Sequence, residues 1–290
     1  MDSSINITCN MKKNIAVLMT VHNRKEKTLA CIRNISQQDG LQNITIQVYL
    51  TDDGCTDGTI EAAKEYFPDL IIIKGNGNLF WNRGMNYAWK EAAKSEHDFY
   101  LWLNDDTMLK KDAINILIRC AEQTNSQSII VGSTYASQSM PLLTYGGRKR
   151  NRKHTLISPH ENHLIECDTF NGNIVLIPKK VFQKIGYNDE YFHHSFGDIE
   201  YGLRASKQGF KNYIAPGVLG YCKRNNPVPI FRRKNIPLFK RYKLLYSPLG
   251  YNPKEDYHLN KKFYPLIICI LWFIKLHINV LFTKDHTLYN

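Results

Sequence analysis

The sequence predicts an α/β domain with a central, largely parallel sheet, followed by a basic and apolar C-terminal extension. Apolar strand-like segments alternate with helix-like segments about four times within the first 133 residues. The 290-residue chain contains 43% hydrophobic and 22% charged residues, which excludes wholesale disorder and low-complexity architecture. The alternation stops after residue 135, and a segment rich in proline and charge begins at Lys223. One large α/β domain with an added segment accounts for these three observations.

Each element of the alternating region is expected for a local reason. Residues 14–21 are a short apolar run, typical of a strand buried on both faces, and residues 44–51 alternate as a strand does. Asp57 is expected to cap a helix. The same patterns predict helices over 25–38, 57–67, 81–95 and 110–124, and strands over 69–74, 98–103 and 128–133. Parallel strands with right-handed crossovers follow, with ligands at the carboxyl ends of the strands.

In the second half of the chain, strand-like and helix-like segments alternate less regularly. Residues 136–170 are polar and are expected to be irregular. A strand over 172–178, a helix over 198–208 and a short strand over 211–215 are expected after it. Residues 223–262 hold five prolines and many charges, and we expect them to form an extension rather than a layer of the core.

The positive charge is concentrated near the C-terminus. The net charge is +12, and residues 223–262 contribute +9 of it, with eleven Lys or Arg against Glu255 and Asp256. Such a block predicts contact with an anionic partner, either nucleic acid or the cytoplasmic face of a membrane. Residues 264–282 are apolar, but their uninterrupted part, 265–274, is too short to span a bilayer. A helix lying on a membrane surface is expected, and a helix docked on the protein's own core is the alternative.

The cysteines and the first residues indicate a cytoplasmic protein. Seven cysteines are scattered without a CxxC pair, so no common zinc module and no disulfide framework are expected. The first ten residues are polar and lack the apolar region of a secretory signal. Residues 1–12 are therefore predicted to be a lead-in before the first strand.

Acidic residues follow two of the predicted strands. Asp52 and Asp53 end the second strand in a glycine-containing turn, where they could accept hydrogen bonds from a base or a ribose; a tight structural turn is the alternative. Asp105 and Asp106 directly follow the fourth strand. Adjacent carboxylates repel each other, and a divalent cation that also binds phosphate would relieve that repulsion. The alternative is an exposed acidic turn.

A glycine-rich segment lies between these two turns. Residues 74–86 contain three glycines and lead into a predicted helix that carries Asn82 and Arg83. Glycines let backbone amides approach a ligand, and a helix N-terminus favours phosphate. This signal is weak by itself.

Four motifs together resemble family 2 glycosyltransferases. In order along the chain they are Val21-His22-Asn23-Arg24, the segment from Asp52 to Thr59, Asn104-Asp105-Asp106, and the segment from Phe196 to Arg204. The resemblance covers residues 13–225 and is closest to bacterial members that build surface polysaccharides, including rhamnosyltransferase-like enzymes. It implies a GT-A fold, with a Rossmann-like nucleotide-binding half and a mixed central sheet. It also implies a nucleotide-sugar donor, a divalent cation (Mn²⁺ or Mg²⁺) and inversion at the anomeric carbon.

The resemblance also implies roles for individual residues. Asp198 matches the catalytic base, and Asp106 matches the direct metal ligand. The residues expected to bind the donor are Val21, Asn23, Asp52, Asp53, Asn82, Arg83, Asn104 and Asp105. Those expected to form the sugar and acceptor pocket are Asn171, Gly172, Asn173, His194 and Glu200.

Two positions depart from the family pattern. The family usually has Glu-Asp where this chain has Gly197-Asp198, so Glu200 is the candidate to share the duty of the missing acid. Many members place a histidine after the last core strand as a third metal ligand, whereas Cys222 lies in that neighbourhood here. Modest metal affinity is therefore expected.

The function expected from the sequence is sugar transfer, by an inverting mechanism, to a growing, lipid-linked glycan at the cytoplasmic membrane face, with no nucleic acid involved. A nucleotidyltransferase is one alternative, but its first loop would be glycine-rich, and Thr20 to Arg24 contains no glycine. A non-catalytic protein that binds nucleotides or nucleic acid is the other. Such a protein would not release nucleoside diphosphate from a nucleotide sugar.

Overall fold

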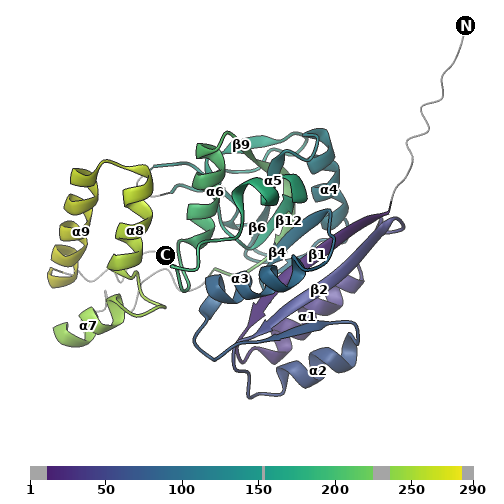
Figure 1. The fold of residues 1–290 in the computed structure, drawn as a ribbon, viewed down its shortest axis with the longest axis horizontal. Coiled ribbons are helices and arrows are strands. Elements are labelled where there is room, and N and C mark those ends of the chain that lie inside the picture. Colours follow the sequence, from purple (N-terminus) through teal and green to yellow (C-terminus); the bar gives the residue numbers. More distant parts are fainter. Residues whose placement is uncertain (1–11, 152–153, 225–235, 283–290) are drawn as a thin grey trace, which may run out of the picture.

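The computed structural model describes residues 12–151, 154–224 and 236–282 (Figure 1). The expected lead-in, apart from Lys12, lies outside the described residues. So do residues 225–235 of the basic segment and the last eight residues.

A ten-stranded mixed sheet forms the centre of the protein, with eight strands in the order β3-β2-β1-β4-β11-β6-β12-β5. β7 pairs with β6, β9 pairs with β12, and β8 and β10 form a separate two-stranded sheet. The strands are β1 Lys13–Val21, β2 Ile44–Asp52, β3 Ile71–Lys74, β4 Phe99–Leu103, β5 Met108–Leu109, β6 Ser128–Tyr135, β7 Leu143–Tyr145, β8 Gly147–Arg148, β9 Ile165–Cys167, β10 Thr169–Phe170, β11 Ile174–Pro178 and β12 Lys211–Tyr221. The first four strands are parallel, as predicted, while β11 runs antiparallel to β4 and β6.

Helices cover both faces of this sheet. The helices are α1 Lys25–Ser36, α2 Thr59–Tyr66, α3 Phe80–Ala92, α4 Ala113–Gln123, α5 Lys179–Ile185, α6 Gly197–Lys207, α7 Leu238–Leu245, α8 Pro253–Phe263 and α9 Leu266–Leu281. Ile15 and Val17 of β1 join a core cluster that includes side chains of α1, α2 and α4. Ala16 and Leu18 join a second cluster, with side chains of α3, α5 and α6. Strand β1 is thus buried on both faces, as predicted from its apolar run.

The strand order places a topological switch between β1 and β4. The chain moves outward from β1 through β2 to β3 and then returns to the other side of β1 to form β4. In sheets of this kind the crevice beyond the carboxyl ends of the strands, at the switch, is the usual ligand site. Arg24, just after β1, and Asp105, just after β4, therefore lie at this crevice.

Several predicted boundaries differ from the structure. Helix α2 begins at Thr59, because Gly58 takes the cap position with φ 77°, although Asp57 still accepts the N–H of Thr59 at 3.1 Å. β12 is eleven residues long rather than five, because register shifts after Ile214 let the strand continue past an irregular stretch. The region 136–170, expected to be irregular, contains β7 to β10. Helix α5 was not predicted.

The C-terminal helices form an extension at one end of the sheet, as Figure 1 shows. Helix α9 packs on α7 and α8. Helix α8 is also tied to the sheet domain, because Lys262 bonds Asp189 at 2.5 Å and Glu200 at 2.8 Å. Glu255, which is 2% exposed, binds the ring of His193 at 2.6 Å. Helix α8 is thus anchored to the sheet domain by half-buried contacts of Lys262 and Glu255. The division of the chain at residue 225 stays a prediction.

Replacement of Lys262 should loosen this anchor. We expect Lys262→Met to lower the free energy of unfolding by about 1–3 kcal/mol, because the fully buried Glu200 loses one of its two cationic partners. The exposed neighbour Lys261 provides the matched control, and Lys261→Met should change stability by less than about 0.5 kcal/mol. Urea denaturation measures both variants, and equal effects would contradict the assignment.

Candidate active site

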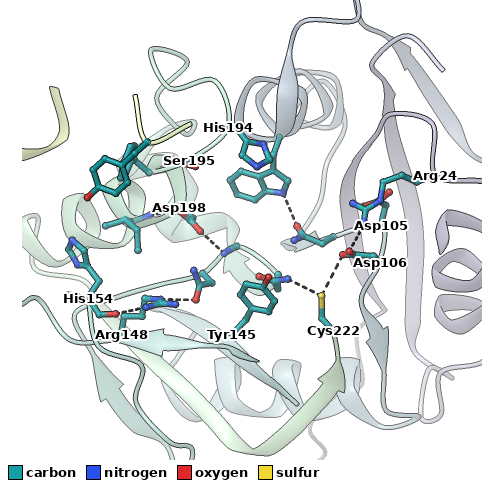
Figure 2. Close-up of a pocket in the computed structure, with 18 residues that line it drawn as sticks. Arg24, Asp105, Asp106, Tyr145, Arg148, His154, His194, Ser195, Asp198 and Cys222 are labelled. Atoms are coloured by element: carbon teal, nitrogen blue, oxygen red, sulfur yellow. Dashed lines mark hydrogen bonds and ion pairs between the residues drawn. The ribbon is translucent and has the colours of Figure 1, made fainter. Parts of the chain in front are cut away.

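Two adjoining cavities lie at the carboxyl ends of the parallel strands. The larger has a volume of about 550 Å³ and the smaller about 430 Å³. Arg24, Trp81, Asp105 and His194 line both of them, so the two form one continuous site with two compartments. Figure 2 shows the larger cavity, with Asp198 on one side and the Asp105–Asp106 pair on the other.

The acidic pair at the end of β4 is held by an arginine. Nη1 of Arg24 bonds Oδ1 of Asp105 at 2.9 Å, and its Nη2 bonds Oδ2 of Asp106. Burial, reinforced by the charge of Asp106, raises the pKa of Asp105 to about 6 despite the nearby guanidinium. The pair therefore sits where negative charge is costly and a cation is strongly favoured.

Cys222 lies after β12, where the resemblance would place a histidine as a third metal ligand. Its Sγ lies 3.5 Å from Oδ1 of Asp106. Burial and the charge of Asp106 raise the pKa of this thiol to about 12, so it is protonated at neutral pH and can donate to the carboxylate. His194 lines the same space. Burial and the charge of Arg24 lower its pKa, which keeps the imidazole neutral.

Asp198 lies in the first turn of α6, facing the larger cavity. Its Oδ2 accepts the N–H of Gly172 at 3.0 Å and its Oδ1 accepts the N–H of Ile199 at 2.8 Å. Burial raises its pKa, although these two hydrogen bonds favour the ionised form. Phe196, two residues before Asp198, has a backbone φ of 72°. This conformation is rare for bulky residues and is found at functional sites. Asp198 is therefore a fixed carboxylate that opens into a cavity, as a general base requires.

The structure explains why glycine precedes this carboxylate. A Cβ atom at Gly197 would overlap the carboxamide of Asn82. Asn82 is fully buried and donates to the carbonyl oxygens of Asp189 at 2.8 Å and Phe192 at 2.9 Å. The space of the missing acid is thus filled by an amide that fixes the loop before α6.

Glu200 does not take over the role of that acid. Its side chain is fully buried, bonds Arg204 at 3.0 Å and Lys262 at 2.8 Å, and lines neither cavity. The expectation that Glu200 belongs to the sugar pocket is corrected by this geometry. At its position on α6, the Glu200 carboxylate faces α8, where Lys262 binds it.

The predicted donor residues divide into two groups. Val21 and Asp53 line the smaller cavity, Asn104 lines the larger, and Asp105 lines both. The Asp53 carboxylate also accepts the N–H groups of Leu79 at 3.0 Å and Phe80 at 2.9 Å, which anchors the start of α3.

The other four predicted donor residues line neither cavity. Asp52 bonds Lys74 at 2.8 Å and the N–H of Cys55 at 2.8 Å. Asn23 accepts the N–H of Thr56 at 2.7 Å. Asn82, described above, and Arg83 hold the loop before α6, with Arg83 donating to the carbonyl of Glu190 at 2.9 Å. These side chains position the loops around the site, and their part in donor binding stays a prediction.

The other four residues predicted for the sugar and acceptor pocket lie together, and their role there stays a prediction. Asn171, Gly172, Asn173 and His194 all line the larger cavity. Five further lining residues were not singled out by sequence: Tyr145, Arg148, His154, Ser195 and Tyr251. Arg148 donates to Oδ1 of Asn171 at 2.7 Å, and burial lowers its pKa. In the sequence Arg148 is the first of several closely spaced basic residues. Its burial, which only the structure shows, distinguishes it from a solvated charge.

Comparisons with known proteins agree with this geometry. The family model described as "Glycosyl transferase family 2" matches residues 16–185. Two curated relatives, each named N-acetylglucosaminyl-diphospho-decaprenol L-rhamnosyltransferase, come from the CDC 1551 and H37Rv strains of Mycobacterium tuberculosis. Each is 22% identical over 202 residues, which is 59% of this chain and 64% of the relative.

A solved structure supports the fold alone. The crystal structure of S. aureus TarS matches 96% of this chain and 44% of its own, with a TM-score of 0.56 and 12% identity. The chain therefore spans less than two thirds of the length of the curated relatives and less than half of TarS.

The packing of Gly197 against Asn82 can be tested by a double-mutant cycle. We expect Gly197→Ala to destabilise the protein by about 1–3 kcal/mol, because the added methyl group has no free space. In an Asn82→Ala background the same substitution should cost much less, giving a coupling energy of at least about 1 kcal/mol by urea denaturation. Additive effects would show that the two residues do not compete for this space.

Proposed function

The chain belongs to glycosyltransferase family 2, and we propose that it transfers a sugar, with inversion, from a nucleotide-sugar donor to a hydroxyl group of a growing surface glycan. One observation carries the proposal. Asp198 and the Asp105–Asp106 pair line the same cavity, which has room for a sugar between them. Direct displacement requires a base and a leaving group on opposite sides of the reacting carbon, and this arrangement supplies both positions.

The two compartments suggest where each part of the donor binds. We place the nucleoside in the smaller cavity, between Val21, Phe80 and the Asp53 loop. Its diphosphate then lies at the junction, beside Arg24, and the sugar enters the larger cavity towards Asn171 and Asn173. Amide side chains suit the hydroxyl groups of a sugar because they both donate and accept hydrogen bonds.

Asp198 acts as the general base in this proposal. An acceptor hydroxyl is a poor nucleophile at neutral pH, so Asp198 takes its proton as the oxygen attacks the anomeric carbon. The bond between that carbon and the diphosphate oxygen breaks in the same step, and the nucleoside diphosphate leaves with the electron pair. The N–H groups of Gly172 and Ile199 hold the carboxylate in a fixed orientation throughout.

The residues present fit a divalent cation that takes most of its ligands from the substrate. Within the described residues no group of three or more His, Cys, Asp or Glu side chains is arranged to hold a metal. Mg²⁺ is commonly bound by one or two carboxylates plus phosphate oxygens and water, and Asp106 with Asp105 can provide the carboxylates. Such a cation would neutralise the charge that develops on the departing diphosphate.

The names of the relatives support a proposal for the substrate class. Their name specifies transfer of L-rhamnose to a lipid-linked N-acetylglucosamine diphosphate. For this chain we propose a hexose or deoxyhexose donor and a lipid-linked acceptor. The nucleotidyltransferase alternative is not favoured, because the matching family model and the relatives concern glycosyl transfer.

We further propose that the C-terminal helices bind the anionic inner face of the cell membrane. Helix α9 buries Cys269, Leu276 and Val280 and exposes large apolar side chains along its other side. These are Leu266, Ile267, Ile270, Leu271, Ile274, Ile278 and Leu281. Helix α7 adds three basic residues and Phe239, which is 83% exposed. Among the described helices none is long and apolar enough to cross a membrane.

Loss of the base should abolish transfer without loss of donor binding. We expect Asp198→Asn to lower the transfer rate by about 10²–10⁴-fold, because an amide cannot accept the acceptor's proton. Burial raises the pKa of Asp198, so in the wild type the acid limb of kcat/KM should lie above the pH at which an ordinary aspartate titrates. Activity falls as pH drops through that pKa, since only the ionised form is a base.

Release of nucleoside diphosphate from a panel of nucleotide sugars, with added acceptor lipid, measures this effect. Glu200→Gln is the matched control: it should reduce stability yet retain turnover below its melting temperature, since Glu200 lies outside the cavity. A near wild-type rate for Asp198→Asn would place the base elsewhere.

Membrane binding should depend on the exposed face of α9. We expect the full-length protein to float with anionic vesicles at low salt and less with neutral vesicles, because basic residues near the surface add about 1 kcal/mol each. Leu271→Glu with Ile274→Glu, at positions 57% and 49% exposed, should abolish flotation. Tyr87→Glu, at an exposed apolar position on α3, should leave it intact. Failure of the wild type to float with either vesicle would refute the membrane proposal.

A further inference from the structure

Arg24 already occupies the position of a cation between the two acidic side chains. The Asp105 and Asp106 side chains are only 5% and 14% exposed, so their repulsion is poorly screened by water. One guanidinium nitrogen bonds each carboxylate. A single arginine thus neutralises half of the charge that a divalent cation would meet.

This contact is built into the fold. Strands β1 and β4 are hydrogen-bonded neighbours, with Leu18 opposite Trp102, so the residues that follow them meet at the same edge. The backbone of Arg24 is fixed as the cap of α1, where its carbonyl accepts the N–H of Thr28 at 3.0 Å. Thr28 in turn lies 3.4 Å from the second oxygen of Asp105.

A divalent cation that binds both carboxylates would have to displace this guanidinium. The metal and the guanidinium would repel each other if both contacted the same pair, and the described part of the chain offers two carboxylates rather than a complete ligand set. Binding of the metal by itself is therefore opposed by an interaction that the free protein already makes.

The side chain of Arg24 also faces the place where an anionic ligand is proposed to bind. It is 36% exposed and lines both cavities at their junction, where the donor diphosphate is proposed to lie. Arginine binds phosphate oxygens through the same fork of donors that it uses for carboxylates. A diphosphate at the junction would therefore attract the guanidinium away from the acidic pair.

We propose that Arg24 is an internal counter-ion that holds the acidic pair in the free protein and moves to the diphosphate when it binds, so that metal and diphosphate bind cooperatively. The diphosphate is taken from the proposed function, but the exchange does not require any sugar to be transferred. Arg24 is a positioning residue in this scheme, because it determines when the pair accepts a metal.

Binding of Mn²⁺ to the full-length protein tests the proposal. Electron paramagnetic resonance counts free Mn²⁺ with and without inorganic pyrophosphate, after subtraction of the Mn²⁺–pyrophosphate complex measured in buffer. For the wild type we expect weak binding of Mn²⁺ alone and about tenfold or greater tightening with pyrophosphate. Arg24→Gln should bind Mn²⁺ alone about tenfold more tightly and lose most of the pyrophosphate effect.

Lys27 offers a matched control on the same helix. Its Nζ lies 3.9 Å from Oδ2 of Asp106, but its side chain is 62% exposed. Lys27→Gln should therefore bind Mn²⁺ within about twofold of the wild type. Arg24→Lys, which keeps the charge but loses the fork, should give an affinity between those of the wild type and Arg24→Gln.

Unchanged Mn²⁺ affinity in Arg24→Gln, with its fold verified by thermal denaturation, would overturn the proposal. So would equal effects of Arg24→Gln and Lys27→Gln. If Arg24→Gln does not fold, Arg24→Lys decides: affinity equal to that of the wild type overturns the proposal, and tighter binding supports it. Cooperative binding in a protein that releases no nucleoside diphosphate from any nucleotide sugar in the presence of acceptor lipid would retain this inference and refute the proposed function.

Discussion

The parallel pairing of β1 with β4 is the constraint on which the site depends. It places two chain reversals side by side at the carboxyl edge of the sheet, one carrying Arg24 and the other Asp105 and Asp106. The two carboxylates are only 5% and 14% exposed, and the arginine provides the charged partner that buried carboxylates need. Ion pairs therefore fix the charged side chains, while the pairing of the apolar strands β1 and β4 fixes the backbone that carries them.

Several acidic residues in the loops around this edge stabilise the local structure. Asp53 holds the start of α3, Asp52 binds Lys74, and Asp57 accepts an N–H at the start of α2. Each carboxylate satisfies backbone or ammonium donors that would otherwise be left unpaired. Asp53 also lines the smaller cavity, whereas Asp106 and Asp198 line the larger one, in which the sugar is proposed to react.

The loop before α6 links the catalytic side of the site to the C-terminal helices. Asp189 and His193, on this loop, bind Lys262 and Glu255 of α8. Tyr251, just before α8, lines the larger cavity and packs edge-to-face on Phe196, with ring centroids 5.1 Å apart. The connection between α7 and α8 thus contributes Tyr251 to the wall of the larger cavity.

The sequence by itself determined the alternating strands and helices, because periodicity and apolar runs are local properties. It also singled out Asp105 and Asp106, since adjacent acidic residues directly beyond an apolar strand stand out from their neighbours, whereas Asp198 was identified only through the motifs that resemble the family. Only the tertiary structure decided the partners of these groups. Glu200 became a docking contact, and Asn82 took the space beside Gly197. Such pairings join residues 60 to 120 positions apart, and which charges meet is set by the packing of whole elements rather than by any local pattern.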